Sequence, residues 1–209
     1  METRKLPKRK EYLNDFKLNE EGKYEYKGIL HELDEKEYSF QKAKQLLTLI
    51  DLLILCMFII AGLVQAVGVM NAVYVTMPYV FAFFAIAVLT FKVIMLHFNR
   101  YPIRDYDFKA TICKFNSYIT IVMVLVLCTL IGELFYIIRY GIEMYLSGTI
   151  IFIVCMIVAF ILSICFNQFN RKLKWKEISN SWKYFHKFDE KATDCMHKFS
   201  HFIDIACKN

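Results

Sequence analysis

Three ionisable residues stand inside long apolar stretches of the sequence, where a charge is costly. They are Asp51, Lys92 and Glu133, and each lies about five residues from the nearer end of its stretch. A charge at the centre of a membrane-spanning helix costs about 2.5 to 3.5 kcal/mol, so each residue is a candidate functional site. Asp51 and Lys92 fall at a similar depth on consecutive stretches, which predicts an intramembrane ion pair. The simpler alternative is that Lys92 extends to the lipid head groups and Asp51 is hydrated.

Glu133 has no basic residue near its depth except Arg139 at the boundary of its stretch. An unpaired buried carboxylate can exchange a proton with the outside or hold a cation, so Glu133 is a candidate transport or ligand residue. Its candidate neighbours are Gln65, Thr129 and Tyr136. The equally weighted alternative is structural: Glu133 reaches the outer interface or bonds to Gln65.

Two helix faces combine small residues with polar ones. In the first apolar stretch, Gly62 and Ala66 form a Gly-x-x-x-Ala motif on the same face as Asp51 and Gln65. The fourth stretch carries small or polar residues at every fourth position: Cys155, Ala159, Ser163 and Asn167. Small residues allow helices to approach closely, so both faces predict helix packing. Packing inside a four-helix bundle is favoured over a ligand surface.

We expect neither an enzyme nor a metal or cofactor. The sequence contains no His-Glu-x-x-His, Gly-x-Ser-x-Gly, Gly-x-x-x-x-Gly-Lys or Gly-x-Gly-x-x-Gly motif. His197 and His201 have the spacing of zinc ligands, but no fourth ligand stands at a recognisable spacing, so a solvated helix face is favoured. The basic clusters lie next to apolar stretches, which indicates membrane topology and no nucleic-acid partner.

The elements that position these residues are four apolar segments. The 209 residues are 57% hydrophobic and 22% charged, with a net charge of +6. Residues 1–45 and 171–209 are rich in charges, whereas residues 144–170 carry none. A soluble domain cannot bury such a run, so we predict an all-α polytopic membrane protein built as a four-helix bundle. The predicted transmembrane helices are residues 46–69, 74–97, 115–138 and 146–167.

A cytosolic segment is expected on each side of the transmembrane domain, 46–167. In residues 1–45, apolar alternation on both sides of a turn predicts a short hairpin, followed by a helix that leads into the first span. Residues 168–209 are predicted to form an amphipathic helical tail. Its apolar seam includes Trp175, Ile178, Trp182, Phe185, Met196, Phe199 and Ile203. The seam is expected to contact the N-terminal segment, a second copy, the membrane surface or another protein.

Lys and Arg determine the expected orientation. They are frequent in both termini and in the link between the second and third spans, and sparse in the other two links. Both termini should therefore be cytoplasmic. Residues 11–17 and 23–28 resemble the leader of small multi-span proteins of low-GC bacteria, and an excess of Lys over Arg, 20 to 6, agrees with an AT-rich genome. We expect an integral protein of a bacterial plasma membrane.

The function expected from these features is association. The chain would be a non-catalytic accessory, assembly or immunity-type subunit that lies in the lipid bilayer and forms a homo-oligomer or part of a larger membrane complex. The alternative is a small oligomeric transporter or channel that uses Glu133 and the layer of Asp51 and Lys92.

Overall fold

The structure is a computed structural model that describes residues 16–18, 24–26, 28–34, 38–99, 101–141 and 146–178. The chain divides into two compact units, Met1–Leu30 with Glu177–Asn209, and His31–Lys176. In the first unit, β1 (Phe16–Leu18) pairs antiparallel with β2 (Tyr24–Tyr26), with Phe16 opposite Tyr26. The Tyr26 hydroxyl donates a hydrogen bond to the carbonyl oxygen of Ile29 at 3.0 Å.

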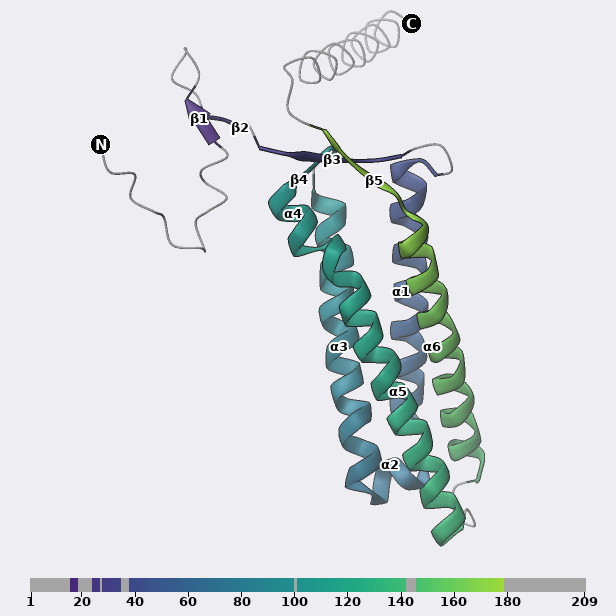
Figure 1. The fold of residues 1–209 in the computed structure, drawn as a ribbon. Coiled ribbons are helices and arrows are strands. Elements are labelled where there is room, and N and C mark those ends of the chain that lie inside the picture. The colour runs from purple at the N-terminus through teal and green to yellow at the C-terminus, as the bar shows by residue number, and fades with distance from the viewer. Residues whose placement is uncertain are drawn as a thin grey trace, which may run out of the picture. The chain divides into compact units, whose positions relative to one another are not determined.

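The second unit is mostly helical, and four of its helices are long and apolar enough to cross a membrane. They are α1 (Phe40–Leu63), α3 (Val73–Phe98), α5 (Ile112–Tyr140), which follows the short α4 (Asp105–Ala110), and α6 (Leu146–Lys172). The four lie side by side (Figure 1), with α1 and α5 each in contact with both α3 and α6. A five-residue helix, α2 (Val67–Asn71), lies between α1 and α3 in the chain.

The first long helix begins and ends earlier than predicted. It covers Phe40–Leu63 instead of 46–69, because good helix formers such as Lys42 and Lys44 extend the apolar stretch toward the N-terminus. The other three long helices include the predicted spans and continue beyond them by a few residues. The final residues of the first predicted span belong to α2 and to the extended link before it.

Large apolar side chains fill the space between the long helices. Phe58, Phe115, Phe152 and Phe166 are fully buried there. The small residues of α6 also face inward: Cys155, Ala159 and Ser163 are buried, and Asn167 is partly buried. On α1, Gly62 contacts Tyr79 of α3, and Ala66 after the helix is buried. Both predicted packing faces therefore make contacts within this chain.

A three-stranded sheet lies at the end of the helices where α1 begins and α6 ends (Figure 1). Its strand order is β4 (Ile103–Arg104), β3 (Leu30–Leu33), β5 (Trp175–Ile178). We call this end of the second unit the strand end, and the opposite end the α2 end.

The prediction that Trp175 and Ile178 begin the amphipathic tail helix is wrong, because both belong to β5. Helix α6 ends at Lys172, and the backbone then pairs with the chain after β3: the Asp34 N–H donates to the carbonyl oxygen of Lys174 at 2.9 Å. Two residues spaced three apart fit a helix seam, but Trp and Ile also favour strands. The seam residues Trp182, Phe185, Met196, Phe199 and Ile203 lie outside the described residues.

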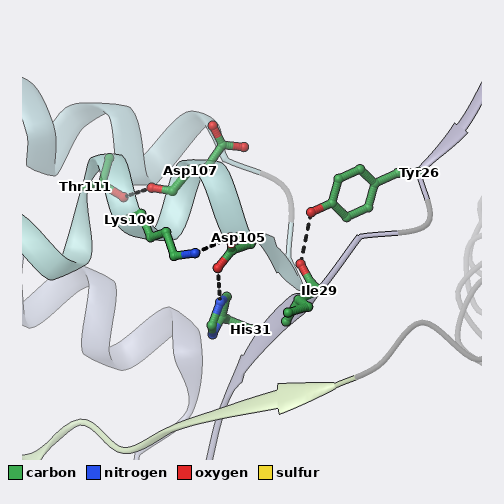
Figure 2. Close-up of polar contacts among 7 residues, drawn as sticks. All are labelled: Tyr26, Ile29, His31, Asp105, Asp107, Lys109 and Thr111. Carbon is green, nitrogen blue, oxygen red and sulfur yellow. Dashed lines mark hydrogen bonds and ion pairs between the residues drawn. The ribbon is translucent and has the colours of Figure 1, made fainter. Parts of the chain in front are cut away.

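Polar contacts fix the strand end to the helices. Asp105 at the start of α4 accepts bonds on both oxygens, from Lys109 Nζ at 2.7 Å and with His31 Nε2 at 2.9 Å (Figure 2). The buried His31 ring also stacks on Phe108, with ring centroids 4.0 Å apart. An ion pair of 3.0 Å joins Asp34 to Lys176. The sheet is thus connected to α4, and through α4 to α5.

Asp105 and Asp107 offer a matched test of these contacts. Both lie in the first turn of α4, but the Asp107 carboxylate makes no hydrogen bond or ion pair within the part of the chain that the structure describes. We expect Asp105→Ala to lower the free energy of unfolding by about 1 to 3 kcal/mol, because it leaves buried His31 without its partner. Asp107→Ala should change it by less than about 0.5 kcal/mol. Unfolding in mild detergent compares them, and equal losses would contradict the role given to His31.

Candidate functional site

Glu133 of α5 is the best-defined polar site in the long helices. Its side chain is fully buried at the α2 end, and Oε1 accepts a hydrogen bond of 3.0 Å from the backbone N–H of Gly68. The backbone N–H of Val69 also lies near the carboxylate. These N–H groups belong to the first turn of α2, where no helical carbonyl is available to them. Glu133 therefore caps the N-terminus of α2.

A second side chain completes this cap. The backbone N–H of Val67 donates a hydrogen bond of 3.2 Å to Thr149 Oγ1 of α6. Helix α2 has no side-chain cap of its own, so its first turn depends on one residue of α5 and one of α6. A carboxylate near a helix N-terminus is also favoured by the helix dipole.

Two glycines allow the backbone to come this close. A Cβ atom at Gly68 would collide with the Glu133 carboxylate, and one at Gly148 would collide with the backbone carbonyl of Gln65. Glycine at both positions lets the link between α1 and α3 pack directly against α5 and α6. We call Glu133, Thr149, Gly68 and Gly148 the α2 cap.

The other residues predicted around Glu133 do not join it. Gln65 is exposed and its side chain does not bond to Glu133. The Thr129 hydroxyl donates to the carbonyl oxygen of Leu125 at 2.9 Å in its own helix, and the Tyr136 ring packs against Tyr140. The arrangement does not bring these residues together as a ligand set. The second carboxylate oxygen of Glu133, Oε2, is buried and has no hydrogen-bond partner among the described residues.

The ion pair predicted between Asp51 and Lys92 is not formed in this structure. Asp51 is 2% exposed and its carboxyl lies beside the Thr90 hydroxyl of α3, whereas Lys92 lies two residues further along that helix. Two residues along a helix differ by about 200° in direction, so Thr90 and Lys92 cannot both face α1. The predicted ion pair took account of the position of Lys92 along its helix, but not of the direction in which its side chain points.

Sequence reasoning missed the backbone partner of Glu133. Gly68 and Thr149 were not singled out, although a signal for them exists. The link that holds Gly68 contains no charged residue, so a buried carboxylate that faces it has only the amides of Gln65 and Asn71 and the backbone N–H groups as donors.

No group of three or more His, Cys, Asp or Glu residues that could hold a metal ion occurs in the described ranges. His197 and His201 lie outside these ranges. No protein-family model, curated protein or solved structure matches the chain. The candidate site therefore has to be interpreted from its own geometry.

The contact between Gly68 and Glu133 predicts a coupled pair. Gly68→Ala should lower the free energy of unfolding by about 1 to 3 kcal/mol, because the added Cβ displaces the carboxylate. In a Glu133→Ala background the same change should cost less, since the colliding group is gone. A double-mutant cycle in detergent measures the coupling.

A control for this cycle is Gly132→Ala, one residue before Glu133 in α5. Its Cβ would lie 3.2 Å from a methyl carbon of Val75, which needs only a small shift. We expect a smaller loss than for Gly68→Ala. If Gly68→Ala costs the same with and without the Glu133 carboxylate, the cap does not hold α2.

A second cycle separates the two possible partners of Asp51. We expect Asp51→Asn and Thr90→Val to be coupled by about 0.5 to 3 kcal/mol, because their side chains are adjacent. Asp51→Asn and Lys92→Met should be additive. A coupling to Lys92 larger than that to Thr90 would restore the ion pair predicted from the sequence.

Proposed function

We propose that the four long helices span a bacterial plasma membrane with the strand end on the cytoplasmic side. The support is the distribution of Lys and Arg. Lys42, Lys44 and Lys114 lie near the strand-end starts of α1 and α5, and Arg171 and Lys172 end α6. Residues 64–72, which link α1 to α3, carry no charge at all. An excess of basic residues is typical of cytoplasmic loops.

Thiol labelling in intact cells tests this orientation. In a background without native cysteines, an impermeant thiol reagent should label a cysteine placed at Asn71 or Ser147, because both lie at the α2 end. A cysteine placed at Lys109 should stay unlabelled. Labelling at Lys109 without labelling at Asn71 would reverse the orientation.

We propose that the protein is a non-catalytic subunit that acts by association, as an accessory, assembly or immunity-type component of a membrane complex or as a homo-oligomer. The observation that carries this proposal is the position of Glu133. Its carboxylate holds the first turn of α2, so the most conspicuous acid in the helices has a structural task. Asp51 is buried beside Thr90 of α3, where α1 and α3 are in contact. A partner would then bind to the outer surface of the protein and not to the buried acids between its helices.

Association is tested on the full-length protein extracted in mild detergent and in native lipid. We expect it to migrate as an oligomer or to co-purify with a second chain. A monomer in both preparations, with no co-purifying chain, would contradict the proposal.

A second candidate function rests on Glu133 Oε2, which is buried without a partner in the described structure. A small transporter or channel, with its path between copies of the chain, would use this oxygen to take a proton or cation. Flux measurements in proteoliposomes under a proton or potassium gradient test it. Flux that falls on Glu133→Gln would favour transport, whereas no flux, or flux that Glu133→Gln leaves unchanged, would exclude it.

A further inference from the structure

Five of the exposed basic side chains at the strand end of the second unit lie at the ends of the long helices. They lie at the start of α1, near the start of α5, and at and just beyond the end of α6. None of them forms an ion pair with another described residue. We call them the basic cluster: Lys42, Lys114, Arg171, Lys172 and Lys174.

Contacts beneath the basic cluster bring its members to one region. Asn170 Nδ2 donates a hydrogen bond of 2.8 Å to Asn116 Oδ1, which joins the last turns of α6 to the first turns of α5. On the other side of α6, the rings of Tyr38 and Phe169 pack with centroids 5.3 Å apart. Helix α6 contacts both α1 and α5, so its basic end lies between the other two helix starts.

Two acidic groups of the strand end are already paired with basic residues outside the cluster, and the remaining described acids, Glu32, Asp107 and Glu177, form no ion pair with it. Asp105 bonds to Lys109 and His31, and Asp34 forms an ion pair with Lys176. These acids are engaged by basic residues outside the cluster. The five basic side chains therefore stay without a paired acid among the described residues, and they outnumber the three unpaired acids of this end.

The position of the basic cluster decides what lies opposite it. The exposed faces of α1 and α6 toward the α2 end are apolar, with Leu49 and Leu52 on α1 and Ile157 and Ile161 on α6. The cluster stands where these apolar surfaces end, which in a membrane is the level of the phosphate groups. Lys and Arg bind phosphate oxygens through charge-assisted hydrogen bonds.

We propose that the basic cluster binds the phosphate groups of anionic phospholipids in the leaflet at the strand end. This inference needs the long helices to span a membrane, but it does not depend on the proposed association. The described part of the α2 end offers no equivalent surface: residues 64–72 are uncharged, and Arg139 in the last turn of α5 is its basic residue.

Two arginines provide a matched test, one at each end of the helices. Purified full-length protein is exposed to equal amounts of phosphatidylglycerol and phosphatidylcholine with the same acyl chains, and native mass spectrometry measures the retained lipid. We expect phosphatidylglycerol to be retained in clear excess. Arg171→Gln should reduce this preference about fivefold, the effect of one basic residue near an anionic surface. Arg139→Gln should leave it unchanged.

A variant with glutamine at all five cluster positions should lose the preference altogether, and its melting in detergent shows whether it is folded. If it does not fold, the two single arginine variants decide the matter. Inorganic phosphate at millimolar concentration should not displace the lipid, and displacement would assign the cluster to free phosphate. Equal retention of the two lipids, or equal effects of Arg171→Gln and Arg139→Gln, would overturn the proposal.

Discussion

The interior of a membrane offers no water to a peptide N–H group, so every such group at that depth must find its partner within the protein. Helix α2 presents the same problem within the protein, because it is only five residues long, Gly68 is buried and the first turn has no cap from its own sequence. Glu133 presents the opposite problem, a buried acceptor without a basic neighbour. The carboxylate of Glu133 accepts a hydrogen bond from the first turn of α2, so each group supplies the partner that the other lacks. A buried donor or acceptor left unpaired costs about 1 to 3 kcal/mol, so neither arrangement would be stable alone.

This constraint explains why the two ends of the helices differ. At the α2 end, the chain turns between α1 and α3 without any charged residue, and its backbone is held by side chains of α5 and α6. Close approach there requires Gly68 and Gly148. At the strand end, the links are longer, polar and basic, and a small sheet connects them through Asp105 and Asp34. One end is uncharged and held by hydrogen bonds to its backbone, whereas the other is polar and basic.

Length and composition alone predicted the four apolar helices, because a run of uncharged residues long enough to cross a membrane has few alternatives. The direction in which a side chain faces, and any pairing with a residue distant in sequence, could not be predicted in the same way. Lys92 was at the right depth but on the wrong side of α3. Trp175 and Ile178 had helical spacing, yet their pairing with a distant strand decided their conformation. The sequence singled out Glu133 as an unusual residue. Its hydrogen-bond partner is a backbone N–H group, which a pattern of side-chain types does not reveal.

Because Glu133 holds α2 through a charge-assisted acceptor, the state of its carboxylate and the position of α2 are linked. Oε1 is engaged by Gly68, while Oε2 has no partner among the described residues. A proton or cation on this group would compete with the N–H groups for its charge and weaken the hold on α2, and a displaced α2 would in turn leave the carboxylate exposed to other partners. Transport that engages Oε1 as well as Oε2 would therefore require α2 to move, whereas a purely structural subunit requires α2 to stay in place. The two candidate functions make opposite demands on the same hydrogen bond, and this makes the contact between Gly68 and Glu133 the place where they separate.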